Sequence, residues 1–415
     1  MLLAVISDGE SRRRCEEHLD ELGRLAETAG YQVRGRIVQE RVRPDVATLL
    51  GRGKVEEVAR RVEELAVTRV FTDDDLTPQQ GARLEKALGV AVVDRAGLIL
   101  EIFESRARTH EARTQVELAS LRYLLPRLSR RWTHLSRQVG GIGVRGGVGE
   151  KQIELDRRIV RKRITGLERD LERITRRRDV RRQRGRNVFT VALLGYTNSG
   201  KSTLFNRLAD ASVHVENKLF ATLDPVRRRI VDREGSMVLT DTVGFLRKLP
   251  HHLVASFRST LEEASEADLL IQVVDVSDPH RDEQMLTSAG VLRDMGLTDR
   301  PRLLVFNKID AVEDAAILSR ERGRTPDALF VSGTTGQGIP DLLSRIRTER
   351  ARTEIETAVE ISPGDTAALA VLHRHGRVVE MNGEGEMVVV TVRTSPASAG
   401  RIRRQLATNG SLRDV

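Results

Sequence analysis

The first hundred residues alternate short apolar runs with amphipathic stretches. The runs LLAVIS, VTRVFTDDD and VAVVD predict β-strands, whereas residues 11–30 and 53–66 carry apolar side chains at helical spacing. This alternation predicts a small α/β domain over residues 1–108 with a largely parallel sheet. The sequence GRGK at 51–54 is open to two interpretations, a phosphate-binding loop or a turn that begins a helix, and so short a motif favours the turn.

Strand signals disappear between residues 109 and 186. Residues 109–138 and 150–186 predict two long helices, and the glycine-rich segment GGIGVRGGVG at 140–149 joins them. We therefore expect an antiparallel helical hairpin over 109–186 with a flexible tip.

Strand and helix patterns alternate again over residues 187–356. The runs FTVALLG, SMVLTDT, DLLIQVVDV, PRLLVFNK and DALFVSG predict a doubly wound α/β domain with a mostly parallel sheet. Two β-like runs on either side of NGEGE at 382–386 predict a hairpin within a small α+β domain over 357–415. The predicted fold class is thus α/β, with the small α/β domain and the helical hairpin before the doubly wound domain and the α+β domain after it.

Charge changes this picture most in the second helix of the hairpin. Residues 157–186 hold fourteen Arg or Lys and four Asp or Glu, and the whole chain carries a formal net charge of +9. A charged run is usually a solvated helix face, but this excess repels itself unless a polyanion neutralises it. It favours contact with nucleic acid, with an anionic membrane surface as the alternative. Aromatic residues are only 3%, so extended base-stacking surfaces are not expected.

Three further features bear on the compartment. The single cysteine, Cys15, excludes an intrachain disulfide and fits a reducing environment. The N-terminal apolar run has its charged flank behind it, as in a β-strand rather than a signal peptide. No apolar run reaches about 18 residues, the length that a membrane span requires. We expect a cytoplasmic protein without a transmembrane segment, monomeric when free, with partial membrane association as the alternative location.

The sequence GYTNSGKS, from Gly195 to Ser202, matches the phosphate-binding pattern G-x-x-x-x-G-K-[ST] between an apolar strand and a helix. The two glycines allow backbone N–H groups to surround the phosphates, Lys201 reaches the β- and γ-phosphates, and the Ser202 hydroxyl binds Mg²⁺. The predicted nucleotide-binding residues of this loop are Gly195, Tyr196, Thr197, Asn198, Ser199, Gly200, Lys201, Ser202 and Thr203.

Two further segments complete the predicted phosphate and metal site. In MVLTDTVGF, Asp241 ends an apolar strand and can hold Mg²⁺ through water, while the Gly244 N–H meets the γ-phosphate. In KLFATLDP, Thr222 is the candidate switch threonine, which closes on Mg²⁺ and the γ-phosphate. Lys201, Thr222 and Gly244 are the predicted catalytic residues. A strand-end Asp or a loop Thr is common in isolation, but their place after a phosphate-binding loop favours the functional interpretation.

The sequence LLVFNKID at 303–310 identifies the base. The Asp310 carboxylate can accept two hydrogen bonds from the ring N–H and exocyclic amine of guanine, whereas adenine would leave it unpaired. Asn307 is expected to brace the loops and the Lys308 stem to lie along the base. A backbone N–H near Ser332 and Gly333 supplies the last contact. These residues predict GTP and GDP as ligands.

Phe245 stands after DTVG, where a Ras-like enzyme carries a glutamine that orients water. Since phenylalanine cannot do this, slow intrinsic hydrolysis is expected, with help from a partner or a monovalent cation. Asn198 resembles the asparagine of potassium-assisted GTPases, which makes K⁺ a candidate ligand of this loop.

With these motifs in view, the chain resembles the HflX family of ribosome-associated GTPases from about residue 30 to about residue 350. The likeness rests on RPDVATLLGRGKVEEV, GGIGVRGGVGEKQIELDRR, GYTNSGKSTLFNRL, LFATLDP and DTVGFLRKLPHHLVASFRSTLEE. The family commonly reads RGPGE where this chain has RGGVGE. The resemblance implies binding to the large ribosomal subunit, through rRNA contacts of the arginine-rich arm, and GTP hydrolysis stimulated there. Relatives split stalled or stress-inactivated ribosomes.

Three rival functions remain open from the sequence. The first is a ribosome-assembly, tRNA-related or RNA-remodelling GTPase without splitting activity. The second is a passive RNA clamp with a vestigial GTPase domain, against which the intact Lys201, Ser202, Asp241 and Asp310 argue. The third is an anionic-membrane partner for the arm, which lacks the apolar face that such a helix requires.

Overall fold

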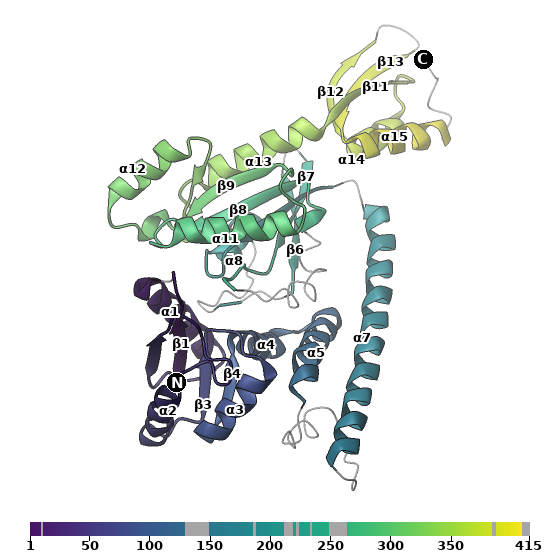
Figure 1. Ribbon diagram of the computed structural model, residues 1–415. Helices are drawn as coiled ribbons and strands as arrows, with labels where there is room; N and C mark the ends of the chain where they lie inside the picture. The colour runs from purple at the N-terminus through teal and green to yellow at the C-terminus, as the bar shows by residue number, and fades with distance from the viewer. Residues whose placement is uncertain are drawn as a thin grey trace. The chain divides into compact units, whose positions relative to one another are not determined.

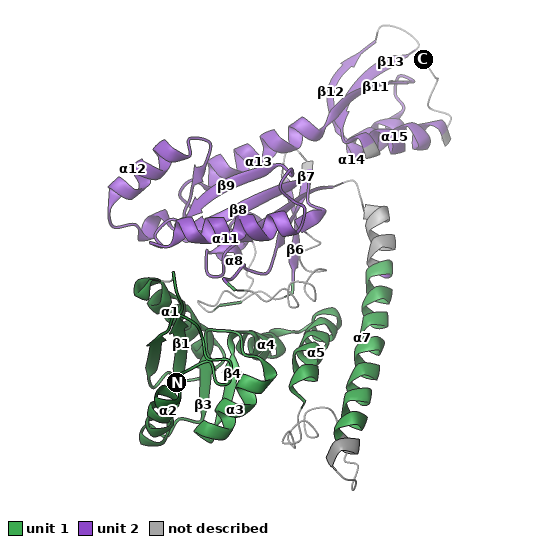
Figure 2. Cartoon of the chain, viewed as in Figure 1, with its two compact units in different colours: residues 1–176, 216–224, 248–259 green, residues 177–215, 225–247, 260–415 purple. Residues whose placement is uncertain are grey.

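The computed structural model describes residues 1–9, 11–128, 149–185, 188–210, 219–220, 224–232, 235–248, 264–383 and 387–408. The chain divides into two compact units (Figures 1 and 2). Unit 1 holds residues 1–176 together with 216–224 and 248–259, and unit 2 holds residues 177–215, 225–247 and 260–415. Two short segments from the middle of the sequence therefore belong to the N-terminal unit.

Unit 1 is built on a four-stranded sheet of order β2-β1-β3-β4 in which every pair is parallel, as predicted. Its strands are β1 (Leu2–Ile6), β2 (Arg36–Glu40), β3 (Arg69–Thr72) and β4 (Ala91–Asp94). The helices between and after them are α1 (Arg12–Thr28), α2 (Arg52–Glu64), α3 (Pro78–Leu88) and α4 (Arg95–Arg106).

Side chains of β1 alternate between two cores, as the period of a strand requires. Leu3 and Val5 pack with α2 and α3, whereas Leu2 reaches α1 at Gly23. Gly51 is the N-cap of α2, so the GRGK segment is the turn that begins a helix, as the sequence favoured.

The helices α5 (His110–Leu124) and α7 (Gly149–Gly185) form the arm (Figure 1). Leu118 and Leu121 of α5 pack against Leu167 of α7, and this cluster holds the two helices together. The first arm helix is shorter than predicted, because Pro126 lies in the 3-10 turn (Leu125–Arg127) that follows α5. Proline lacks the N–H that a continuing helix needs. Residues 129–148, with nearly all of the glycine-rich tip, lie outside the described residues.

Unit 2 contains a six-stranded sheet of order β10-β9-β8-β5-β7-β6, in which only β6 runs antiparallel to its neighbour. The doubly wound, mostly parallel sheet is therefore confirmed. Its strands are β5 (Phe189–Gly195), β6 (Val226–Asp232), β7 (Gly235–Asp241), β8 (Leu269–Asp275), β9 (Arg302–Asn307) and β10 (Leu329–Phe330).

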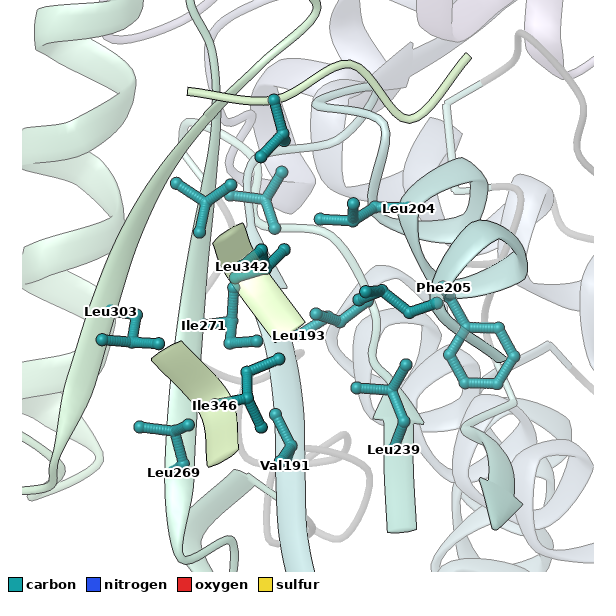
Figure 3. Packing of buried hydrophobic residues seen from close by; sticks show 14 of the residues in the cluster. Val191, Leu193, Leu204, Phe205, Leu239, Leu269, Ile271, Leu303, Leu342 and Ile346 are labelled. Carbon is teal, nitrogen blue, oxygen red and sulfur yellow. The ribbon is translucent and has the colours of Figure 1, made fainter. Parts of the chain in front are cut away.

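Helices cover both faces of this sheet. The main core lies between the sheet and two helices, α8 (Lys201–Ala209) and α13 (Ile339–Thr353), which bury Phe205, Leu342 and Ile346 (Figure 3). The second core lies on the opposite face, beneath α11 (Arg281–Asp294) and α12 (Ala315–Arg324), and includes Phe306.

Strand β6 was not predicted from the sequence. It reads VRRRIVD and pairs only with β7, at the edge of the sheet. Charged side chains protect an edge strand from further pairing, and here they hide the apolar alternation that identifies the other strands.

The C-terminal part of unit 2 is a three-stranded antiparallel sheet of order β11-β13-β12 with two helices. The pairing of β12 with β13 confirms the predicted hairpin, whereas the third strand, β11, was not anticipated. Its elements are β11 (Ile355–Ile361), α14 (Thr366–His375), β12 (Arg377–Asn382), β13 (Val388–Thr394) and α15 (Pro396–Thr408). Within the described part of the chain, no helix combines the length and apolar character needed to cross a membrane.

Candidate nucleotide site

The predicted nucleotide residues follow the carboxyl ends of neighbouring parallel strands of unit 2. The phosphate-binding loop follows β5, and Asp241, Asp275 and Asn307 end β7, β8 and β9. Parallel strands place these ends on one edge of the sheet, where doubly wound domains bind their ligands.

The phosphate-binding loop depends on two glycines. Gly195 has φ +148° and Gly200 has φ +86°, conformations that other residues rarely adopt. A Cβ on Gly195 would collide with the Val273 carbonyl, and one on Gly200 would collide with the Asn307 amide. The loop therefore lies against β8 and the β9 loop, and α8 begins directly after it with its N-terminal N–H groups at the site.

Lys201 is buried, with 6% of its surface exposed, inside this loop. Its Nζ donates to the carbonyls of Gly195 at 3.1 Å and Tyr196 at 2.8 Å. Burial lowers the pKa of Lys201 to about 8, although the Asp241 carboxylate opposes that shift. Phosphate groups would stabilise the protonated ammonium.

Ser202 and Asp241 form the pair that fits Mg²⁺. The Ser202 hydroxyl donates to Asp241 Oδ2 at 2.7 Å, and Asp241 is fully buried. Hydroxyl and carboxylate oxygens, completed by phosphate and water, are the ligands that Mg²⁺ prefers. No cluster of three or more His, Cys, Asp or Glu able to hold a metal occurs among the described residues, so the nucleotide phosphates would complete the coordination.

Buried hydroxyls within the loop also suit a bound ligand. Thr197 Oγ1 and Ser199 Oγ are buried and have no hydrogen-bond partner in the described structure. Asn198 between them has φ +62° and an exposed side chain. Thr203, in the first turn of α8, is half-buried. Because unpaired buried polar groups are costly, a phosphate or cation here would satisfy them.

Asn307 connects the loops around the predicted base pocket. Its Nδ2 donates to the Ser199 carbonyl at 3.0 Å, and its Oδ1 accepts the Gly333 N–H at 3.0 Å. Lys308, at φ +63°, pairs with Asp275 Oδ2 at 2.7 Å. These contacts agree with the bracing role expected of Asn307 and fix the Lys308 side chain.

The base-reading residues lie in short turns after β9 and β10. Asp310 lies in a 3-10 turn with its side chain exposed, available to a ligand. The Ser332 N–H donates to the Gln337 carbonyl at 2.9 Å, and the Gly333 N–H is engaged by Asn307. A guanine contact at Gly333 would therefore share this N–H with Asn307.

Two supporting residues escaped the sequence analysis. Arg207 donates from Nε to the Gly333 carbonyl at 3.2 Å and from Nη2 to the Thr334 carbonyl, and nothing in the sequence singled it out. Asp275, the partner of Lys308, ends a buried strand, and that position could have identified it.

The segment after Asp241 lies against the phosphate-binding loop. The Phe245 N–H donates to the Gly195 carbonyl at 2.9 Å, and its carbonyl accepts the Thr197 N–H at 2.7 Å. A Cβ on Gly244 would come within 2.9 Å of Lys201 Nζ. The Phe245 side chain is buried, with 2% exposed, and is therefore not available to orient water.

Of the two predicted positions that remain, Tyr196 lies within the described residues and Thr222 does not. The Tyr196 hydroxyl accepts the Arg247 N–H at 2.9 Å, so this loop residue also binds the segment after Gly244. Thr222, predicted to bind Mg²⁺, lies outside the described residues.

A separate cavity of about 570 Å³ lies in unit 1 between α3, β4, α4 and α5. Its charged lining residues are Arg69, Glu85, Asp94, Glu101, Glu104 and Arg127. Arg69 pairs with Glu101 and Arg127 with Asp94, so the remaining lining charge is negative. This cavity is not complementary to a polyphosphate, and the residues predicted to bind a nucleotide lie instead in unit 2.

Comparison with known proteins decides the family. Family models match in chain order: a GTP-binding GTPase N-terminal region over residues 16–104, a GTP-binding GTPase middle region over 106–185, and a 50S ribosome-binding GTPase over 190–308. The GTPase HflX of Magnetococcus marinus is 45% identical over 99% of this chain and 95% of its own length. The chain belongs to the HflX family of GTPases. The HflX of Escherichia coli is 46% identical over 82% of this chain and 80% of its own length.

A solved structure also aligns with the chain. A GTP-binding protein of Sulfolobus solfataricus in complex with GDP is 24% identical, covers 85% of this chain and 98% of its own, and has a TM-score of 0.43. Membership of the HflX family, together with the phosphate-binding loop in unit 2, makes this chain a GTP hydrolase that binds guanine nucleotide.

The lowered pKa of Lys201 leads to a prediction about proton uptake. Phosphate raises the pKa of the buried ammonium, so GTP binding at pH 8 should take up about half a proton per site. The affinity for GTP should be constant well below pH 8. It should fall as the pH rises from about 8 to the higher pKa that Lys201 has in the complex with GTP. Calorimetric titration in buffers of different ionisation enthalpy measures the uptake. A Lys201→Met variant is the control, and zero uptake by the parent chain at pH 8 would contradict the assignment.

Asp310 leads to a prediction about base specificity. Asp310→Asn should lower GTP affinity about 30-fold to 100-fold, since a charged hydrogen bond is worth about 2–3 kcal/mol. Xanthosine triphosphate should become the better ligand, because its ring edge presents an acceptor. Competition with a fluorescent guanine nucleotide measures both constants. The nearby exposed Glu313 provides a control, Glu313→Gln, with the same loss of charge. Equal GTP affinity in both variants would refute the base assignment.

Proposed function

We propose that this HflX-family GTPase binds the large ribosomal subunit and uses GTP binding to split or rescue stalled and inactive ribosomes. The alternative function is that of a ribosome-assembly or RNA-remodelling GTPase without splitting activity. Both functions require the same predicted GTP site. They differ in whether the GTP-bound protein dissociates an intact ribosome into its subunits. The family model matched over residues 190–308 is described as a 50S ribosome-binding GTPase, which supports the ribosome as partner.

The exposed cations of α7 are the observation that carries the proposal. Arg163 of α7 pairs with Glu117 of α5 at 2.7 Å, whereas Glu168, an acid of α7, pairs with Arg122 of α5 at 2.6 Å. Other basic side chains of α7 are exposed, including Arg158, Arg161, Lys162, Arg169, Arg176 and Arg177. A row of arginines on a helix fits the phosphate backbone of rRNA better than a membrane, because the apolar cluster of α7 around Leu167 is packed against α5.

In the proposed cycle, GTP is held by the loop from Gly195 to Ser202 with Asp310 reading the base. Ser202, Asp241 and Thr222 would hold Mg²⁺, which neutralises charge on the phosphates during the reaction. Lys201 stabilises negative charge on the β- and γ-phosphates. Since the buried Phe245 cannot position water, hydrolysis should be slow until the ribosome completes the site.

Purified ribosomes provide the test of this function. Large subunits should raise the GTPase rate at least tenfold, and light scattering of intact ribosomes should fall when the chain and a non-hydrolysable GTP analogue are added. The triple variant Arg161→Ala/Lys162→Ala/Arg169→Ala should lose the stimulation of GTPase rate by large subunits and keep its intrinsic rate. Any remaining binding of this variant to large subunits should depend less on salt concentration than binding of the parent chain does. Stimulation without a fall in scattering would favour the assembly or remodelling alternative, and no stimulation would refute both.

Asn198 leads to a prediction about monovalent ions. K⁺ beside the phosphates would supply positive charge in addition to that of Lys201, so GTP turnover should be several-fold faster in potassium than in sodium. Asn198→Ala should remove the difference and leave nucleotide affinity nearly unchanged, because the side chain is exposed. Turnover is measured by phosphate release at equal ionic strength. Equal rates in the two salts would exclude potassium assistance.

A further inference from the structure

Unit 1 contains two segments that lie in the sequence beside positions predicted to contact the γ-phosphate, although those positions serve a nucleotide site in unit 2 (Figure 2). The first segment, 216–224, includes Thr222, and the second, 248–259, follows Gly244. The described residues of the first segment are Leu219, Phe220 and Asp224, and that of the second is Lys248. Lys248 stands four positions after Gly244 in the sequence. The chain itself therefore connects the phosphate-sensing loop of unit 2 to side chains of unit 1.

Lys248 pairs with Asp73 at the point of unit 1 where a doubly wound sheet would bind a ligand. Asp73 directly follows β3, and the connections that leave β1 and β3 run in opposite directions, from β1 to β2 and from β3 to β4. Such a switch point, at the carboxyl ends of the strands, is the usual ligand crevice. Here Lys248 Nζ lies 2.5 Å from Asp73 Oδ2, so a lysine of the chain takes the place of a ligand.

The pair completes a buried charge cluster. Asp73 is 2% exposed and Arg95 is 1% exposed, and they pair at 2.6 Å. Arg95 also pairs with Glu21 at 2.8 Å, and His18 Nδ1 lies 3.7 Å from Asp73 Oδ2. Asp73 thus faces three basic groups, Arg95, His18 and Lys248. Removing the Lys248 ammonium would take an ion-pair partner from this buried carboxylate, which is destabilising.

The ionisation of both partners agrees with this pairing. Burial alone would raise the pKa of Asp73, but Arg95 and Lys248 hold it below its ordinary value. Burial would lower the pKa of Lys248, but Asp73 raises it above its ordinary value. The partners are therefore charged at neutral pH, and the pair is a firm attachment point for this segment.

Asp224 makes the second attachment, at the start of the arm. Its Oδ2 accepts the N–H groups of Arg108 at 3.0 Å and Thr109 at 3.2 Å, and Thr109 Oγ1 hydrogen-bonds to its Oδ1. Thr109 is the N-cap of α5, so the Asp224 carboxylate lies at the favourable end of that helix dipole. Phe220 adds an apolar contact, with its ring centroid 4.7 Å from that of Phe103.

We propose that Lys248 and Asp224 are positioning residues that couple the nucleotide state of the GTP site to the N-terminal unit and the arm. The proposal rests on the GTPase site described above and does not require ribosome splitting. In this proposal, a γ-phosphate beside Lys201 displaces the backbone bridge at Phe245, because even a Cβ on Gly244 would come within 2.9 Å of Lys201 Nζ. This displacement moves Lys248 relative to Asp73.

Coupling of this kind is reciprocal. If GTP weakens the pair of Lys248 with Asp73, then the pair disfavours GTP relative to GDP by the same factor. Removing the pair should therefore raise the affinity of the isolated chain for GTP relative to GDP. The quantity to measure is a ratio of two affinities, so a general loss of folded protein cancels from it.

A double-mutant cycle on the isolated chain tests the first attachment. Lys248→Met and Asp73→Asn should each raise the ratio of GTP to GDP affinity at least fivefold, and the double variant should rise no further than either single one. Lys248→Arg, which keeps the charge, should stay within twofold of the parent chain. An unchanged or lower ratio in Lys248→Met would overturn the proposal, whatever happens to Asp73→Asn. No ribosome is present, so failure of the proposed splitting function leaves this result unaffected.

Hydrogen exchange tests the second attachment. The Arg108 and Thr109 amides should exchange at different rates with GDP and with a non-hydrolysable GTP analogue, since Asp224 accepts both N–H groups. Asp224→Asn should remove the difference while GTP still binds. Identical exchange of these amides in the two nucleotide states of the parent chain would overturn the role of Asp224.

Discussion

The predicted nucleotide site depends on one constraint, the burial of the Lys201 ammonium in a loop of neutral carbonyls. Two carbonyl oxygens accept its hydrogen bonds, and only Asp241 contributes an opposite charge. The loop requires glycine at two positions, because a side chain on Gly195 or Gly200 would push the loop away from β8 or Asn307. Lys308, the second cation nearby, is held by Asp275. The loop is thus built around a positive charge that a phosphate can balance.

Unit 1 holds the opposite arrangement at the same position of its own sheet. Asp73 follows β3 at the carboxyl edge, and its buried carboxylate pairs with the cations of Arg95 and Lys248. One site therefore attracts an anion and the other a cation. Lys248 stands four positions after Gly244, so the chain between them spans at most about 14 Å. Two oppositely charged strand-end sites joined by a short segment can communicate without a long pathway of packed side chains.

The mostly parallel sheets and the phosphate-binding loop were predictable from the sequence, because each depends on local apolar period or on glycine spacing. Asp241 and Asn307 were predictable for the same reason, since both end strongly apolar runs. Strand β6 was missed because its arginines mask the period, and the end of α5 because the following basic residues extend a helical pattern beyond Pro126. The pairs of Lys248 with Asp73 and Asp224 with Thr109 join residues more than 100 positions apart, and no local pattern encodes them.

Phe245 connects the absence of a water-orienting side chain with the proposed coupling, because the same residue anchors the segment that leads to Lys248. Its backbone forms two hydrogen bonds with the phosphate-binding loop, and its buried side chain gives this segment a fixed position. A glutamine at the same place would need an exposed side chain to reach water, and the segment would lose that apolar anchor. The position therefore favours a well-defined switch over intrinsic catalysis. Under the function proposed above, slow hydrolysis would keep the chain in its GTP-bound state long enough to find a large target, and the exposed arginines of α7 would direct that search.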